Sequence, residues 1–222
     1  MQSIKLHVTT LLLGCCALAG AASAANVQDI VRETQRMSMA DGRVEMVWWI
    51  PTQFWEESLK TSPMVTDAAR QQVVAAMADY TVIAVMSART GVGGLSDVQP
   101  KAEMLRNLQL TVNGKPVDPL PPEQIAPVTM VLLAQMKPAI AATAGQVGQG
   151  IEFVTYPGKV DGKPLLDATL TGSMAVTFYG KTYQWHLPLG SLLPPRVDKS
   201  TGDEFPGNYL YNPYTGRKLG DK

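Results

Sequence analysis

The chain of 222 residues has very few side chains of the kinds that carry out metal and nucleophilic chemistry. It contains two cysteines, Cys15 and Cys16, and two histidines, His7 and His186. Three of these four residues lie in the first sixteen positions, within a segment that we expect to be removed. The remaining chain then has no thiol for a disulfide, and a transition-metal site would need mostly carboxylates, which no segment clusters. We therefore expect no cofactor.

Residues 1–24 have the layout of a secretory signal peptide. Lys5 precedes an apolar run that reaches Leu18, and Ala22-Ser23-Ala24 has the small-residue pattern of a cleavage site. The run is too short, and too interrupted by glycine and cysteine, for a transmembrane anchor. An alternative interpretation is a lipobox that ends at Cys15 and attaches a lipid there. We expect the protein to be periplasmic or secreted, or alternatively lipid-anchored in the cell envelope.

An excess of charge of one sign is also lacking. The chain has 19 basic and 19 acidic residues, and its formal net charge is zero. Nucleic acids and anionic membrane surfaces attract proteins with a basic excess, so neither is an expected partner. Without disulfides the mature chain must be stabilised by burial, and about 200 residues suffice for one core. We expect one main domain over residues 25–193 and a separate tail over residues 194–222.

The clearest structural signal is a hairpin near the end of the main domain. A two-residue turn at Gly180-Lys181 would pair Phe178 with Tyr183 and collect the apolar side chains on one face. The opposite face, which carries His186, is then polar and exposed to solvent. Similar turns are predicted at Asp41-Gly42, Asn113-Gly114 and Asp161-Gly162.

Helical patterns separate these hairpins. Helices are predicted within residues 52–79 and 122–142, with Thr66 as the N-cap of one and Pro138 as an interruption of another. Residues 80–86 are rich in β-branched side chains and predict a strand buried on both faces. The predicted fold class is α+β: an antiparallel sheet built from hairpins, helices packed on one face, and a small C-terminal tail.

A glycine-rich segment follows the buried strand. Gly91-x-Gly-Gly lacks the third glycine of a dinucleotide fingerprint, and no lysine occupies the position that a phosphate loop requires. We expect a mobile loop there.

Ten of the eleven methionines follow the leader. Three of them, Met37, Met39 and Met46, would share one face of the first hairpin. Copper(I) prefers thioether ligands, so this face is a candidate copper site. The competing interpretation, which we favour, is that the three side chains fill gaps in the core.

Two adjacent tryptophans offer a candidate stacking platform. Side chains alternate along a strand, so only one of Trp48 and Trp49 faces inward. The other is exposed, covered by another element, or used to stack on a sugar. Together with two carboxylates that converge from distant segments, such a platform would suit a secreted glycan hydrolase.

The tail contains two five-residue frames, residues 198–202 and 212–216, which both end in Thr-Gly. The second, within Tyr211-Asn-Pro-Tyr-Thr-Gly-Arg-Lys-Leu219, resembles the knuckle of zinc-ribbon proteins, in which Cys-Pro-x-Cys-Gly-x-x-Leu recurs. The resemblance covers about residues 198–219. It places four residues where the thiolates would stand: Asp198, Thr201, Asn212 and Thr215. Hydroxyl and amide oxygens are poor zinc ligands, so we expect a metal-free knuckle.

These observations lead to one expected function and two alternatives. The sequence contains no convergent set of nucleophile, base and metal ligands, which favours a non-catalytic binding or structural protein of the periplasm or cell exterior. Its partner would be an envelope protein or a glycan. The alternatives are a carboxylate-dependent glycan hydrolase and a methionine-based copper(I)-handling protein.

Overall fold

The computed structural model describes residues 23–60, 65–144 and 146–221. Most of the predicted leader, including Cys15, lies outside the described residues. The described residues form both helices and strands, and the strand pairs among them are antiparallel, which confirms the predicted α+β class.

Two sheets form the main domain. Sheet A consists of β1 (Gln35–Ala40), β2 (Arg43–Ile50), β3 (Tyr80–Gly91), β4 (Gly94–Val98) and β7 (Glu152–Pro157). Its order is β1-β2-β3-β4, and β7 also pairs with β3. Sheet B consists of β5 (Leu108–Val112), β6 (Lys115–Val117), β10 (Gly172–Phe178) and β11 (Lys181–Leu187), in the order β11-β10-β5-β6. A small separate hairpin joins β8 (Lys159–Val160) to β9 (Lys163–Pro164).

Helices connect and cover these strands. They are α1 (Ser23–Thr34), α2 (Thr52–Lys60), α3 (Asp67–Ala78), α4 (Lys101–Arg106), α5 (Pro127–Ala144) and α6 (Gln146–Gln149), with short 3₁₀ helices η1 (Pro122–Gln124) and η2 (Gly190–Leu192). Within the described part of the chain, no helix has the combination of length and hydropathy needed to cross a bilayer.

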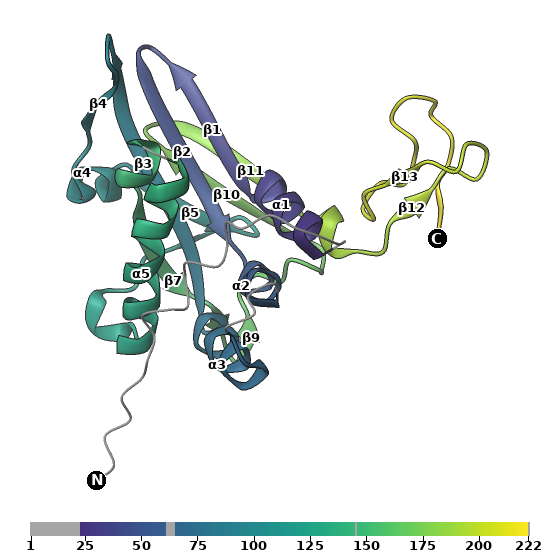
Figure 1. Ribbon diagram of the computed structural model, residues 1–222, viewed down its shortest axis with the longest axis horizontal. Helices are drawn as coiled ribbons and strands as arrows, with labels where there is room; N and C mark the ends of the chain where they lie inside the picture. Colours follow the sequence, from purple (N-terminus) through teal and green to yellow (C-terminus); the bar gives the residue numbers. More distant parts are fainter. Residues whose placement is uncertain (1–22, 61–64, 145, 222) are drawn as a thin grey trace.

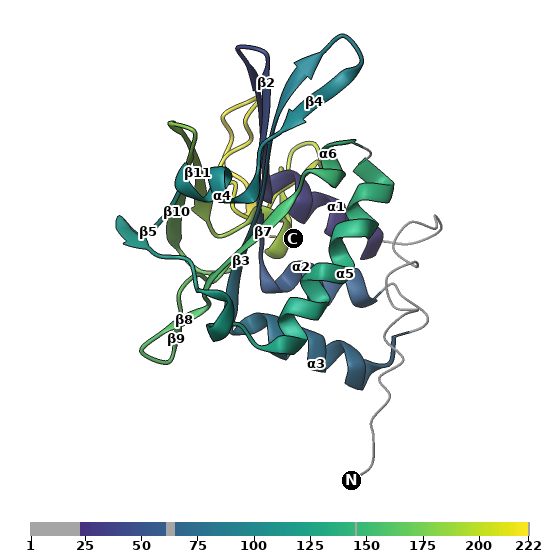
Figure 2. The same cartoon turned by 90° about the vertical axis from the view of Figure 1, so that its left-hand side faces the viewer.

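The main domain has three layers, which Figures 1 and 2 show from two sides: helices, sheet A and sheet B. Trp49 and Val47 of β2 face sheet B and pack in a core with Trp185 and Phe178. The alternate residues of β2, including Trp48, face the helices instead. Because both faces of sheet A are covered, residues 81–88 are buried throughout, which confirms the predicted buried strand.

The sequence pattern predicted the start of α3 correctly, but it did not predict that α5 is continuous. The hydroxyl of Thr66 accepts a hydrogen bond from the backbone N–H of Ala69 at 3.2 Å, as an N-cap should. The predicted interruption at Pro138 is wrong, because α5 continues through it. Met136 of this helix is buried against sheet A, and such tertiary packing can outweigh the cost of a proline.

The glycine-rich segment is a hairpin turn and not the loop we expected. Gly91 ends β3, Gly94 begins β4, and the two residues pair directly. The turn therefore extends sheet A beyond its helical cover.

The turn between β10 and β11 lies one residue earlier than predicted. Tyr179 and Gly180 occupy it with φ values of 47° and 80°, so Phe178 pairs with Lys181. Two residues with positive φ form the turn type that best matches the twist of a hairpin. Every predicted pair shifts by two residues, and side chains alternate with period two, so the predicted apolar face is retained. His186 stays on the exposed outer face, opposite Ser173.

The register of the first hairpin is confirmed, with Met37 opposite Met46 and Met39 opposite Val44. The prediction that all three methionines lie in the core is wrong. Met46 is buried, but Met37 is 53% exposed and Met39 is 78% exposed. The reason is that β1 is an edge strand, beyond the helices that cover β2 and β3.

Candidate functional site in the C-terminal module

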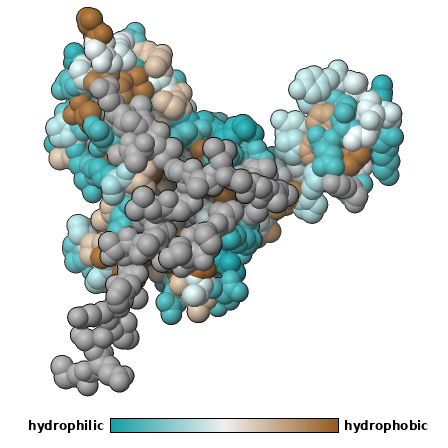
Figure 3. Space-filling model, viewed as in Figure 1, coloured by the Kyte–Doolittle hydropathy of each residue, from teal (hydrophilic) through white to brown (hydrophobic). Residues whose placement is uncertain are grey.

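Residues 196–221 form a small lobe, here called the C-terminal module, which stands apart from the two sheets (Figures 1 and 3). Its central strand β12 (Arg196–Val197) pairs with β13 (Glu204–Phe205) and β14 (Gly220–Asp221). The two predicted frames, residues 198–202 and 212–216, form its two principal turns.

The two frames adopt the same backbone hydrogen bonds. In each, the first residue donates its N–H to the carbonyl oxygen five positions later, at 2.9 Å in one frame and 2.7 Å in the other. The glycine in fifth place donates back to the first carbonyl, at 2.7 and 2.8 Å. Both glycines have a left-handed φ, 79° at Gly202 and 71° at Gly216, which favours glycine over other residues. The two frames thus form the same turn twice, and each turn is called a knuckle below.

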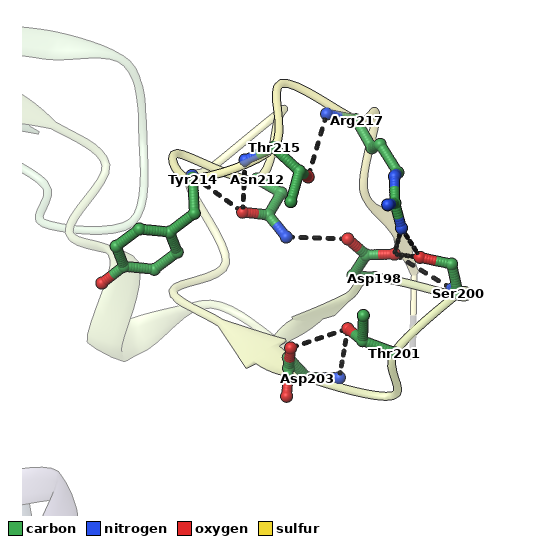
Figure 4. A network of polar contacts seen from close by, with 8 residues as sticks. All are labelled: Asp198, Ser200, Thr201, Asp203, Asn212, Tyr214, Thr215 and Arg217. Atoms are coloured by element: carbon green, nitrogen blue, oxygen red, sulfur yellow. Dashed lines mark hydrogen bonds and ion pairs between the residues drawn. The ribbon is translucent and has the colours of Figure 1, made fainter.

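Two side-chain hydrogen bonds join the two knuckles (Figure 4): Arg217 donates to the hydroxyl of Ser200, and Asn212 donates to Asp198. The amide nitrogen of Asn212 donates to Oδ2 of Asp198 at 2.7 Å, and both side chains are buried. The other oxygen of each side chain accepts bonds from its own knuckle. Oδ1 of Asp198 accepts from the N–H and hydroxyl of Ser200, while Oδ1 of Asn212 accepts from the N–H of Tyr214 and Thr215.

These bonds determine the charge state of Asp198. The hydroxyl of Ser200 and then the amide of Asn212 lower the pKa of Asp198 to about 2, from an ordinary value of 3.8. The Arg217 guanidinium lies 3.9 Å from the same carboxylate and adds to the effect. Asp198 is therefore ionised at neutral pH and is satisfied by partners from both knuckles.

The four positions that match zinc-ribbon ligands do not fit zinc. Thr201 accepts from the N–H of Asp203 and donates to its carboxylate, and Thr215 accepts from the N–H of Arg217. Each hydroxyl thus bonds within its own knuckle, and a single carboxylate is no substitute for four thiolates. Within the described residues, no three His, Cys, Asp or Glu side chains converge. Side-chain hydrogen bonds, and not a cluster of such ligands, link the two knuckles within the described residues.

The module also exposes large side chains that the sequence reasoning did not single out. We define the tyrosine surface as Tyr209, Leu210, Tyr211 and Tyr214, which are 41%, 59%, 57% and 88% exposed. The ring of Tyr214 lies 6.4 Å from that of Phe205, and its backbone N–H is held by Asn212. The signal in the sequence was the density of aromatic residues around Asn212.

Close backbone contacts attach the module to the main domain. The N–H of Gly207 donates to the carbonyl of Gly190 at 3.1 Å, and Asn208 donates to the carbonyl of Pro188 at 3.2 Å. A Cβ on Gly207 would lie 2.4 Å from Cβ of Leu193, so only glycine fits. On the other side of this contact, the carboxylate of Glu33 in α1 accepts from the N–H of Gly190.

The two tryptophans proposed as a stacking platform are both buried. Trp49 lies in the core between the sheets, and Trp48 is covered by helices, with its indole N–H donating to the hydroxyl of Thr34 at 3.2 Å. The ring of Phe54 in α2 lies edge-on to Trp48, with centroids 5.2 Å apart. Neither ring is accessible to a sugar in this structure.

A polar cluster that the sequence did not predict lies between the two sheets, beside their apolar core. Ser38 and Glu45 of sheet A meet Lys181 and Tyr183 of sheet B there. Ser38 and Lys181 are 143 residues apart, so no local pattern in the sequence could have paired them.

Comparison with protein-family models, curated protein sequences and solved structures found no match to the chain. What the protein does must then follow from its own residues.

Proposed function

We propose that this protein is an exported, non-catalytic binding protein of the cell envelope, which contacts its partner through the tyrosine surface of the C-terminal module. One observation carries the proposal: four large side chains are exposed within six consecutive residues, 209–214, of a module whose backbone is tightly hydrogen-bonded. Clusters of exposed apolar or aromatic side chains are typical of interaction sites. Tyrosine in particular is enriched in protein interfaces.

The geometry of the module favours binding with a low entropic cost. Tyr214 lies within the turn held by Asn212, and Tyr211 forms a β-bridge with Lys218. A backbone that is already ordered loses little freedom when a partner binds. Tyrosine adds contact area with only two side-chain torsions to immobilise.

The test is site-specific photo-crosslinking in cells that export the full chain. A photoreactive residue at position 210 should give a discrete adduct, which the double substitution Tyr211→Ser and Tyr214→Ser abolishes. A photoreactive residue at Val92, which is fully exposed on the main domain, is the control. Digestion by protease or by a glycan hydrolase identifies the partner as protein or glycan. The same adducts from positions 210 and 92, or none from 210, would contradict the proposal.

Copper(I) handling is the second candidate, and the exposure of Met37 and Met39 favours it. Met37 and Met39 lie on the same face of the β1–β2 pair as Met46, which is opposite Met37 on β2. Two accessible thioethers therefore lie beside a third, buried one. Met46 is buried, and its sulfur accepts a hydrogen bond from Gln35 at 3.1 Å.

Titration with copper(I) against a chromophoric chelator tests this candidate. The variant with Met37→Leu and Met39→Leu should lose binding, while Met130→Leu, which alters a partly exposed methionine of α5, should retain it. If the unsubstituted protein takes no copper from the chelator, this function is ruled out.

A further inference from the structure

Four hairpins of the main domain have the same turn pattern, in which a residue and a glycine, both with positive φ, precede a cationic residue. The turns are Asp41-Gly42-Arg43, Asn113-Gly114-Lys115, Asp161-Gly162-Lys163 and Tyr179-Gly180-Lys181. Asp and Asn tolerate the left-handed conformation, whereas a bulky aromatic residue there is an outlier. Tyr179, with φ of 47°, is the exception among the four. Backbone outliers of this kind are concentrated at functional sites.

The turn at Tyr179-Gly180 and the turn at Asp41-Gly42 line the same pocket. Sheets A and B bring Arg43 and Lys181 to the lining of one open cavity of about 900 Å³, which Tyr179, Ser38 and Glu45 also line.

Neutral groups hold both cations in the same manner. Arg43 donates to the hydroxyl of Ser87 at 3.1 Å, and its guanidinium carbon lies 4.6 Å from the ring centre of Tyr179. Lys181 donates to the hydroxyl of Ser38 at 2.7 Å, and its ammonium lies 5.4 Å from the ring centre of Tyr183. Each cation is thus positioned by one serine hydroxyl and one tyrosine ring.

Most N–H donors of Arg43 and Lys181 make no hydrogen bond within the described part of the chain. A guanidinium has five N–H donors and an ammonium has three. Among the described residues, neither Arg43 nor Lys181 has a carboxylate within 4.0 Å. The third cation that lines the pocket, Arg89, is paired with Asp97 at 3.4 Å.

Glu45 is a carboxylate that interacts with both cations, yet it is poorly suited to neutralise them. Its carboxylate accepts a long hydrogen bond, 3.4 Å, from the hydroxyl of Tyr183. Burial raises its pKa, although Arg43 and Lys181 act in the opposite direction. Asp41 also lines the pocket, but the cations of the lining, Arg43, Arg89 and Lys181, still outnumber its two carboxylates.

We propose that this pocket binds an oxyanion, the carboxylate or phosphate group of a small ligand, between Arg43 and Lys181. The oxyanion accepts charge-assisted hydrogen bonds from both cations, which are stronger than bonds between neutral groups. The serines and tyrosines act as positioning residues, because they hold the cations in place before the ligand arrives.

Inorganic phosphate, and separately acetate, is titrated into the full mature protein. Chloride is lowered in step, so that the ionic strength stays constant. The readout is the shift of the backbone amide signals of Gly42 and Gly180 in NMR spectra. Lys181→Met should weaken binding at least about tenfold, because a charge-assisted hydrogen bond is lost. Ser38→Ala keeps every charge and should still weaken binding, about three- to tenfold for a neutral-to-charged bond that positions the lysine.

The chain supplies a matched control in Lys115→Met. Lys115 also follows the glycine of a two-residue turn in sheet B, so the charge lost and the turn position are the same. Its substitution should leave the affinity unchanged. Equal losses from Lys115→Met and Lys181→Met would show only a general charge effect and would overturn the proposal, as would unshifted signals in both the phosphate and the acetate titration. The anion that binds more tightly, phosphate or acetate, shows which oxyanion group the pocket prefers.

Discussion

Tyr179 shows how one residue can be costly for the fold and still be retained. A left-handed conformation costs a non-glycine residue about 1–2 kcal/mol. Its hydroxyl is buried and has no hydrogen-bond partner among the described residues, although Arg43 and Ser87 lie near it. The ring offsets part of this cost, since it packs on Arg43 and lies edge-on to Phe178 with centroids 4.8 Å apart.

Replacing only the hydroxyl of Tyr179 separates these effects. Tyr179→Phe keeps the ring contacts and removes the unpaired polar group, so the free energy of unfolding should rise by about 1 kcal/mol. Urea unfolding followed by tryptophan fluorescence measures it. Tyr183→Phe is the control and should lower stability, because that hydroxyl donates to Glu45. A loss of stability in Tyr179→Phe would show that the hydroxyl is satisfied.

Asp198 makes the stability of the module depend on pH. Its pKa is lowered from 3.8 to about 2 in the folded chain, so the unfolded state binds a proton first as the pH falls. The stabilisation is complete above about pH 4 and is lost as the pH falls towards 2. Near-UV circular dichroism of the module tyrosines should follow this loss.

A substitution that mimics protonation provides the complementary measurement. Asp198→Asn keeps only one acceptor oxygen, so the bond from Asn212 or the bond from the Ser200 N–H is lost, and the module should be destabilised at pH 7 and lose its pH dependence. Asp221→Asn removes the same charge from an exposed position of the module and should change neither property. If Asp198→Asn behaves like Asp221→Asn, the bond between the knuckles does not stabilise the module.

At the scale of elements, the attachment of the C-terminal module depends on backbone contact with η2. Gly207 lies so close to Leu193 and Pro194 that an added Cβ would be 2.4 Å from both. Gly207→Ala should therefore separate the module from η2 and destabilise this contact by about 1–3 kcal/mol, as overpacking does.

Hydrogen exchange of the Gly207 amide, which donates to the carbonyl of Gly190, measures the effect directly. The amide should exchange faster in a variant with alanine at this position. Gly93→Ala is the control, because no atom lies within 4 Å of the added Cβ. Unchanged protection in Gly207→Ala would mean that the contact is not closely packed.

At the scale of the whole molecule, the ionisation of Glu45, which lies between the two sheets, makes the stability of the fold depend on pH. Burial raises its pKa above the ordinary 4.5, so the folded state holds its proton to a higher pH than the unfolded state. The contribution of Glu45 to stability is therefore fully present below pH 4.5. It is lost as the pH rises through the raised pKa.

Glu45→Gln should remove this dependence. The stability of the variant relative to the parent should increase between pH 4.5 and pH 8 in urea unfolding curves collected at several pH values. Glu204→Gln, an exposed site on the module, is the charge-matched control. A constant difference between Glu45→Gln and the parent at all pH values would contradict the shift.

Much of the fold could be predicted because its signals are local. Asp41-Gly42 and Asn113-Gly114 specify their hairpins without help from the rest of the chain. The turn at Tyr179 was misplaced because tyrosine is not a usual turn residue. The exposure of Met37 could not be predicted, since it depends on how far helices from other parts of the chain extend over sheet A.

The sequence by itself determined the turns at Asp41-Gly42, Asn113-Gly114 and Asp161-Gly162, the apolar faces of the first and last hairpins of the main domain, and the two Thr-Gly frames, because each arises from residues close together in the chain. The tertiary structure decided that sheets A and B pack face to face, that Arg43 and Lys181 line one pocket, and that Asp198 binds Asn212. These pairings depend on which buried surfaces fit together, and that is a property of the whole chain rather than of any segment.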